Sequence, residues 1–214
     1  MEWDNLFPSL LVTLHVTVIA LLCSIISGIL IALIITQFKW VEISLLPYAI
    51  ILQVTPVIAI APLIIILVDN TFVATLICAW LVSFFPILSS TVIGLKSTDK
   101  SLVDLFKLYK ASKFQSLFLL RLPSALPFIM SGFKISVGLS LIGAIVAEFV
   151  TGIGGSSSGL AYTIIESSYR LEIPKMFAAL ILIAFTGVIL FFLASLLSKL
   201  FLFRWHESEQ YFEK

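Results

Sequence analysis

Long apolar runs separated by polar connections dominate the pattern of the sequence. Five such runs cover about residues 8–36, 44–68, 71–95, 124–150 and 174–203. Each run is long enough to cross a membrane, because a helix needs roughly 20 consecutive apolar residues to span the hydrocarbon core of a bilayer. The pattern therefore predicts an all-α integral membrane protein with about five transmembrane helices. The two longest connections are residues 96–123 and 151–173.

Positive charges are distributed unevenly among the connections. Lys and Arg residues near span ends mark the cytoplasmic side of a membrane protein. Only Arg170 and Lys175 lie outside if the N-terminus is outside, and Lys134 falls within a span. The other ten of the 13 cations then lie inside: Lys39, Lys96, Lys100, Lys107, Lys110, Lys113, Arg121, Lys199, Arg204 and Lys214. The distribution predicts an outside N-terminus, an inside C-terminus and a cytoplasmic 96–123 segment.

Composition supports a membrane protein and excludes several other classes. Hydrophobic residues make up 60% of the chain and charged residues 12%, and the mean hydropathy is +1.16. These values leave too little polar surface for a soluble domain, and a net charge of +1 argues against a nucleic-acid partner. Cys23 and Cys78 lie inside apolar runs, so we expect buried thiols and no disulfide framework. Acidic Glu2 and Asp4 follow Met1, so we expect no cleaved signal peptide.

The 96–123 segment has the pattern of two short helices joined by a turn. Thr98 or Asp99 is placed to cap the first helix, and the Ala111-Ser112 region is placed to open the second. Apolar side chains recur at helical spacing in the first helix, at Leu102, Leu105, Phe106 and Tyr109. Periodicity leaves two interpretations open: a helix that lies on anionic lipid, or a helix that docks a soluble partner.

Small residues and prolines distinguish the fourth apolar run. Pro123 and Pro127 stand at its start, where a missing backbone N–H is tolerated. Its small residues let neighbouring helices approach closely; they are Ser131, Gly132, Ser136, Gly138, Ser140, Gly143 and Ala144. We therefore expect this span to be packed inside the protein.

Four polar residues within the spans are candidates for a functional site. Ionisable groups inside a membrane are costly, and Glu148 and Lys134 are such groups. Glu148 fits either a functional group near the outer end of its span or a locally paired carboxylate. Lys134 fits either attraction of an anionic solute or a snorkelling, interface-paired cation. Gln53 and Thr55 fit either a functional polar lining or interhelical hydrogen bonds.

Residues 104–127, DLFKLYKASKFQSLFLLRLPSALP, resemble the EAA loop through which permeases of ATP-binding-cassette (ABC) importers couple to their ATPase. The family pattern is Glu-Ala-Ala, three residues, Gly, nine residues, an aliphatic, one residue and Leu-Pro. At this spacing the chain has Asp104-Leu105-Phe106, Lys110, Leu120 and Leu122-Pro123, and Ala111-Ser112 match the family's Ala-Ser. Lys110 replaces a glycine, which makes a turn with positive φ costly.

Three further segments carry the resemblance along nearly the whole chain. They are VTPVIAIAPLIIILVDN (54–70), SFFPILSSTVIGLKSTD (83–99) and IVAEFVTGIGGSSSGLAYTI (145–164). In this order they are similar to segments of permeases for nitrate, sulfonates, taurine and pyrimidine thiamine precursors. The chain is thus identified as a member of the binding-protein-dependent type I importer permeases. We expect residues 1–214 to form a single permease domain with that fold.

The resemblance implies partners and a location. Two permease subunits, often identical, surround a central path in the lipid bilayer of the bacterial cytoplasmic (inner) membrane. In such a permease, the candidates for the translocation path or its gate are Gln53, Thr55, Lys134 and Glu148, and Glu148 would organise the outer gate or meet the binding protein. Two ATPase subunits dock at the loops, and a substrate-binding protein docks on the other side. The composition of GIGGSSSG (152–159) indicates an outer linker. The family resemblance implies that this segment serves as a lid or as a contact for the binding protein.

Other functions fit the sequence less well. No G-x-x-x-x-G-K-[ST] phosphate loop is present, so we expect no directly bound ATP and ATP hydrolysis on a partner. No H-E-x-x-H, C-x-x-C or G-x-S-x-G pattern is present either, so we expect no catalytic residues and no metal. A self-sufficient secondary transporter often has inverted repeats, which this chain lacks, and it remains the alternative. The solute class stays open among nitrate, sulfonate or taurine, and a thiamine precursor.

Overall fold

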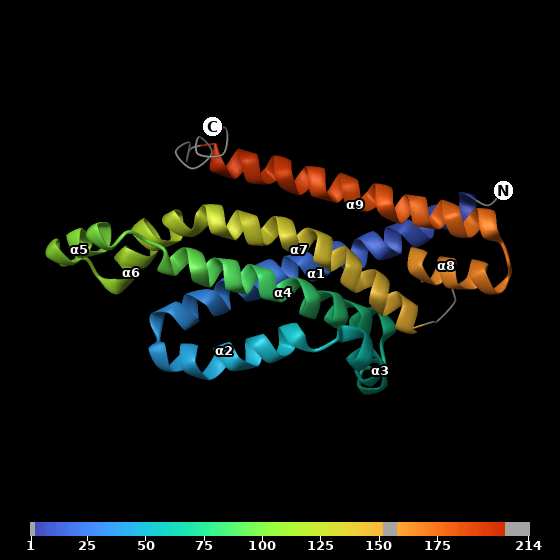
Figure 1. Ribbon diagram of the computed structural model, residues 1–214, viewed down its shortest axis with the longest axis horizontal. Helices are drawn as coiled ribbons and strands as arrows, with labels where there is room; N and C mark the ends of the chain where they lie inside the picture. Colours follow the sequence, from blue (N-terminus) through green and yellow to red (C-terminus); the bar gives the residue numbers. More distant parts are fainter. Residues whose placement is uncertain (1–2, 152–157, 204–214) are drawn as a thin grey trace.

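The structure, a computed structural model, describes residues 3–151 and 158–203, and these residues form helices and no strands. The helices are α1 (Trp3–Gln37), α2 (Lys39–Val54), α3 (Val57–Leu67), α4 (Thr71–Lys96), α5 (Lys100–Leu108), α6 (Lys113–Ser116), a π-helix η1 (Leu117–Arg121), α7 (Leu122–Thr151), α8 (Leu160–Tyr169) and α9 (Ile173–Leu202). Figure 1 shows α1, α4, α7 and α9 running along the long axis of the molecule. The all-α prediction is confirmed.

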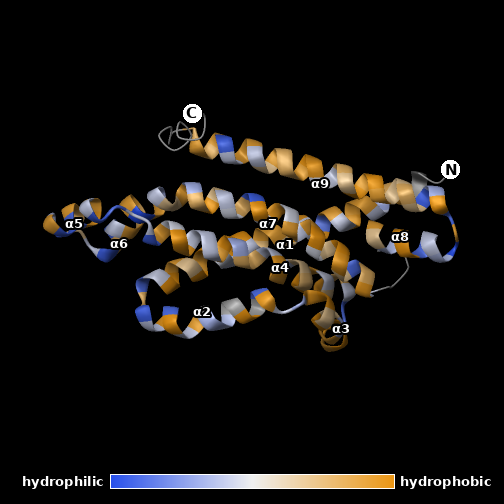
Figure 2. Cartoon of the chain, viewed as in Figure 1, coloured by the Kyte–Doolittle hydropathy of each residue, from blue (hydrophilic) through white to orange (hydrophobic). Residues whose placement is uncertain are grey.

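Different helices lie at the two ends of this bundle. Helices α5 and α6 project from one end, which we call the loop end, and α9 also finishes there (Figure 1). Helix α1 starts at the opposite end, beside α8 (Figure 1). Hydrophilic residues gather at the loop end, around the α1–α2 turn and in the α8–α9 connection, whereas the long helices are mostly hydrophobic (Figure 2). An ion pair between Lys96 and Glu42 joins the ends of α4 and α2 at the loop end.

Close packing of α4 against α7 forms the centre of the bundle. A Cβ at Gly132 would lie 2.8 Å from the carbonyl oxygen of Pro86, and one at Gly143 would lie 2.8 Å from the Cα of Ala79. The Ser136 hydroxyl donates a 2.7 Å hydrogen bond to the backbone oxygen of Ser83. These contacts confirm that the fourth apolar run is packed inside the protein, as its small residues predicted.

The prediction of one continuous helix for the second apolar run, 44–68, is wrong. The run is divided between α2 and α3, and the chain is extended at Thr55, with ψ 123°, and at Pro56, with ψ 108°. The ring of a proline disfavours the helical conformation at the preceding residue, which explains why α2 ends before Pro56. The two short helices together still carry the chain from the loop end to the opposite end (Figure 1).

Four helical stretches in the described part of the chain are long and apolar enough to cross a membrane. They are Leu6–Gln37, Thr71–Lys96, Lys113–Thr151 and Ile173–Leu202. They match four of the five predicted spans. Because α2 and α3 have only 16 and 11 residues, neither reaches the roughly 20 residues that a single spanning helix needs.

The fourth span begins earlier than predicted and has no break at its Leu-Pro sequence. Helix α6 passes through η1 directly into α7, so that Pro123 lies in the first turn of α7. In η1 the N–H of Leu122 donates to the carbonyl oxygen of Leu117, five residues earlier, instead of the usual four. This wider turn accommodates the chain before Pro123, whose nitrogen has no hydrogen to donate.

Candidate functional site

The first helix of the 96–123 segment starts at an aspartate cap. The Asp99 carboxylate accepts the Ser101 hydroxyl at 2.5 Å and the Ser101 backbone N–H at 2.9 Å. Both bonds favour the ionised carboxylate and hold the pKa of Asp99 below its ordinary value. The cap confirms that α5 begins where Asp99 predicted it.

The second helix starts at a reciprocal cap. The Ser112 hydroxyl accepts the Gln115 N–H at 3.2 Å, and the Gln115 side chain accepts the Ser112 N–H at 2.7 Å. This capping box satisfies two backbone donors that the first turn of a helix leaves without partners. The predicted helix–turn–helix, with its second helix opening at Ala111-Ser112, is confirmed.

The turn between these helices keeps a glycine-like geometry although it contains a lysine. Lys110 has φ 54°, in the left-handed region. The Ala111 N–H donates to the Phe106 carbonyl at 3.0 Å, and the Lys110 N–H donates to the Lys107 carbonyl at 2.9 Å. These two bonds form a Schellman motif, in which a left-handed residue ends the helix. Lys110 thus retains the conformation for which the family pattern has glycine.

Lys110→Gly is expected to stabilise this turn by about 1 kcal/mol, because glycine adopts positive φ without the steric cost that an L side chain has. Hydrogen exchange at the Ala111 amide should then slow by about fivefold. Lys107→Gly is the matched control: it places glycine inside α5 and should destabilise the helix by about 1 kcal/mol. Faster exchange at Ala111 in Lys110→Gly would contradict this account of the turn.

The side chains of the 96–123 segment are mostly exposed. Leu105 is exposed, Phe106 is half-buried, and Asp104 pairs with Lys107 at 2.7 Å on the surface. The tip of the loop presents Leu108, 83% exposed, and Tyr109, 78% exposed. Leu122 and Pro123 are half-buried at the start of α7, beyond η1. The segment therefore presents an apolar tip on a firmly capped scaffold.

Two of the four predicted path residues line one cavity. A space of about 330 Å³ lies beside the break between α2 and α3, and Gln53, Thr55, Phe85 and Val146 are among its lining residues. Thr55 donates its hydroxyl to the Ile51 carbonyl at 2.7 Å. Gln53 is exposed, and its side chain has no hydrogen-bond partner among the described residues. The Pro56 break thus brings an amide and a hydroxyl to a cavity wall.

Lys134 lies apart from that cavity. It is half-buried in α7, and no ion pair engages it within residues 3–151 and 158–203. It does not line the cavity of Gln53 and Thr55. The structure therefore does not bring Lys134 to the predicted path residues Gln53 and Thr55.

Glu148 joins three helices at the end of the bundle opposite the loop end. Its side chain is buried, with 6% of its surface exposed. The carboxylate accepts the Thr13 hydroxyl of α1 at 2.8 Å and the Ala161 N–H of α8 at 3.1 Å. The Thr13 oxygen in turn accepts the Leu160 N–H at 2.9 Å. Helix α8 is therefore held at its N-terminus by side chains from α7 and α1, where a carboxylate is favoured by the helix dipole.

Sequence reasoning missed three participants in this arrangement: Thr13, Gly159 and the whole of α8. A Cβ at Gly159 would overlap the Glu148 carboxylate, so the close approach requires glycine. A buried carboxylate needs donors, and this requirement was a signal that a polar residue such as Thr13 in the first span would face it. Residues 152–157 of the Gly-Ser connection lie outside the described residues.

These features define a class of protein. Long apolar helices that pack closely through small residues, with a capped helix pair at one end, are the features of a multi-pass membrane protein. Within the described residues, no group of three His, Cys, Asp or Glu side chains is placed to hold a metal ion.

The chain belongs to the family of binding-protein-dependent transport system inner membrane components, whose family model matches residues 6–205. It is the permease component of an ABC transporter, a multi-pass inner-membrane transport component and not an enzyme. The family resemblance read from the sequence is confirmed.

Known proteins resemble the chain over most of its length. It is 34% identical over 181 residues to a "Probable ABC transporter permease protein" of Haemophilus influenzae, which covers 85% of this chain and 72% of that protein. It is 33% identical over 183 residues to the "Formylaminopyrimidine transport permease protein ThiX" of Halalkalibacterium halodurans, with 86% and 72% covered. A solved amino acid ABC transporter shares the fold, with a TM-score of 0.74, 18% identity and 94% of each chain covered.

Proposed function

We propose that residues 1–214 form one permease domain that pairs with a second, identical subunit around a path for a small solute. A substrate-binding protein delivers the solute, and a separate ABC ATPase hydrolyses the ATP; the chain itself binds no nucleotide. The observation that carries the proposal is the capped α5–α6 pair with its apolar tip of Leu108 and Tyr109. An exposed apolar tip on a rigid scaffold suits docking into a groove of a soluble partner.

Orientation follows from the same proposal. The loop end carries Lys96, Lys100, Lys107, Lys110 and Lys113. Cation-rich connections stay on the cytoplasmic side, so the loop end faces the cytoplasm and α8 faces outward. This arrangement places the ATPase at α5 and α6 and the binding protein at the end where Glu148 holds α8. Glu148 then organises the outer gate.

For the solute we propose the thiamine-precursor class, from a range that also includes nitrate and sulfonate or taurine. The cavity beside the α2–α3 break is lined by the aromatic side chain of Phe85 and the amide of Gln53, and none of the described residues that line it is charged. An aromatic face and neutral hydrogen-bonding groups suit a pyrimidine better than an anion. A similar permease, ThiX, is named for formylaminopyrimidine.

Gln53→Leu is expected to lower pyrimidine uptake by about fivefold, because the change removes one hydrogen bond to the solute at nearly constant side-chain volume. Uptake of labelled formylaminopyrimidine is measured in vesicles that contain the complete transporter. Solute binding by the binding protein and the basal ATPase rate should not change. Unchanged uptake would contradict the role of this cavity, and preferred uptake of nitrate or taurine by the wild type would contradict the solute class.

A further inference from the structure

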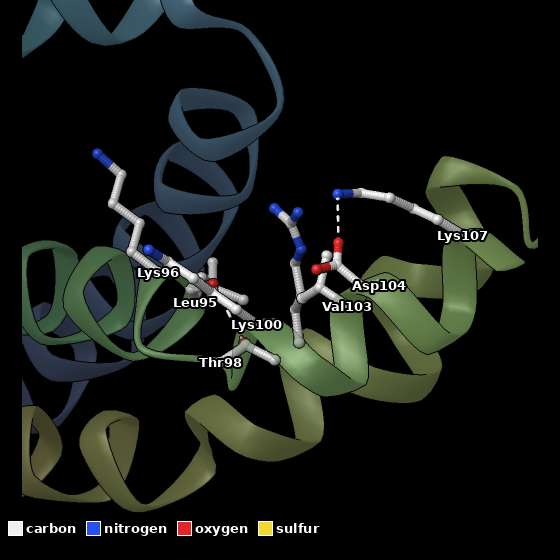
Figure 3. A pocket seen from close by; sticks show the side chains of 8 residues that line it. Leu95, Lys96, Thr98, Lys100, Val103, Asp104 and Lys107 are labelled. Carbon is white, nitrogen blue, oxygen red and sulfur yellow. Dashed lines mark hydrogen bonds and ion pairs between the residues drawn. The ribbon is translucent and has the colours of Figure 1, made fainter.

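Two adjoining cavities at the loop end share a set of basic side chains. The first, about 440 Å³, lies where α4 ends and α7 approaches, and it is lined by Lys96, Lys100, Asp104, Lys107 and Arg121 among others. The second, about 380 Å³, is also lined by Lys107 and Arg121. Figure 3 shows the Asp104–Lys107 pair on one side of the first cavity, and Lys96 and Lys100 on the other.

Charges around the first cavity do not balance. Lys107 and Asp104 both line the cavity and form an ion pair with each other, and Lys96 pairs with Glu42. No ion pair engages Lys100 or Arg121 within the residues that the structure describes. Among the described residues, the cavity therefore keeps about two positive charges that no carboxylate neutralises, and an anion with several acceptor oxygens would satisfy them.

A π-helical turn in the backbone sets the direction of the Arg121 side chain. This residue is half-buried and is the last residue of η1, the π-helical turn that precedes α7. A π-helical turn holds more residues than an α-helical one, so it changes the direction in which the following side chains point. Single π-turns inside helices are rare and are frequently found at functional sites.

The cavity also lies where apolar helix meets polar chain. Residues 71–95 of α4 carry no charge, and Lys96 is the first cation after them; residues 122–133 carry no charge, and Arg121 stands just before them. Exposed apolar side chains lie near the same boundary, with Phe118 53% and Leu119 68% exposed. A site at this level reaches both the headgroups and the acyl chains of a bilayer.

We propose that Lys100 and Arg121 bind the phosphate group of an anionic phospholipid in this cavity. The phosphate oxygens accept hydrogen bonds from the guanidinium of Arg121 and the ammonium of Lys100, while Phe118 and Leu119 contact the acyl chains. A free phosphate ion offers the same oxygens but no acyl chains, and the position at the apolar boundary therefore favours the lipid. The lipid would anchor the base of the α5–α6 pair to the membrane.

The test compares Lys100→Gln/Arg121→Gln with a control, Arg170→Gln/Lys175→Gln, which removes the same charge at the opposite end. The full-length chain is titrated in detergent with phosphatidylglycerol, with phosphatidylcholine and with inorganic phosphate, and bound lipid is counted by native mass spectrometry. Thermal unfolding under each condition gives a second readout. Each cation near a membrane surface strengthens binding by about fivefold, so the double variant should bind phosphatidylglycerol about 25-fold more weakly.

We expect the wild type and the control variant to bind phosphatidylglycerol more tightly than phosphatidylcholine and to unfold at a higher temperature with it. Equal binding of the two lipids by the wild type would overturn the proposal. Unchanged phosphatidylglycerol binding by the Lys100→Gln/Arg121→Gln variant would overturn the assigned site. Stabilisation by inorganic phosphate, but not by phosphatidylglycerol, would show a free-ion site and would overturn the lipid assignment.

Discussion

Gly159→Ala is expected to destabilise the protein by about 3 kcal/mol and to abolish most solute uptake. The new Cβ would occupy the position of the Glu148 carboxylate, so either that carboxylate or α8 must move. Overpacking costs about 1–3 kcal/mol, and loss of a hydrogen bond to a charged group costs about 1.5–3 kcal/mol. Backbone strain contributes nothing, because Gly159 has φ −82°, which any residue adopts. Thermal unfolding in detergent and uptake in vesicles measure the two effects.

Gly138→Ala is the matched control for this prediction. A Cβ at Gly138 meets no atom within 4 Å, so alanine there should be neutral or stabilise α7 by up to about 1 kcal/mol. A double-mutant cycle tests the mechanism: in a Glu148→Ala background, Gly159→Ala should cost less than about 1 kcal/mol, because the carboxylate is gone. An equal cost in both backgrounds would refute the contact between Gly159 and Glu148 as its cause.

Leu108→Ser/Tyr109→Ser is expected to detach the ATPase and leave the permease folded. Both side chains are more than three-quarters exposed at the tip of the loop, so their loss should change the free energy of unfolding by about 0.5 kcal/mol or less. As apolar anchors of an interface, each should contribute about 2 kcal/mol to binding, so the double variant should bind the ATPase about 1,000-fold more weakly. Co-purification with the tagged permease, and the ATPase rate with loaded binding protein, measure this loss.

Tyr169→Ser/Leu171→Ser provides a control of the same chemistry at the other end of the molecule. These residues are 86% and 81% exposed at the end of α8. The ATPase should co-purify with this variant as it does with the wild type. Retention of the ATPase by Leu108→Ser/Tyr109→Ser would assign docking to another part of the chain.

Much of the fold could be predicted from the sequence, because local sequence signals agreed with the structure. Long apolar runs correctly predicted four of the spans. Only a sufficiently long apolar helix pairs all of its backbone N–H and C=O groups and also presents apolar side chains to the lipid. Asp99 and Ser112 marked the starts of α5 and α6, because their side chains accept the backbone N–H groups that open a helix. Small residues in the fourth run correctly indicated close helix packing.

The parts that sequence reasoning missed depend on contacts between distant residues or on compromises in the backbone. Hydropathy does not register a break at Pro56, because mostly apolar sequence continues on both sides of it, despite Gln53 and Thr55. Helix α8 follows a Gly-Ser-rich stretch and is fixed by Thr13, which lies 135 residues from its partner Glu148. Lys110 was expected to make positive φ costly, yet the two Schellman hydrogen bonds hold it in that conformation. The contact between Thr13 and Glu148 is tertiary, and local propensity does not contain it. The break at Pro56 and the turn at Lys110 are local backbone features that hydropathy does not reveal.

The central claim is that this permease moves solute only when a separate ATPase acts through it. We would reconstitute the chain with its ATPase in lipid vesicles and measure solute uptake with loaded binding protein, with and without ATP on the ATPase side. The account predicts uptake that requires ATP, the ATPase and the binding protein together, and no response to an imposed proton or sodium gradient. Gradient-driven uptake by the chain alone would contradict it and would identify a self-sufficient secondary transporter.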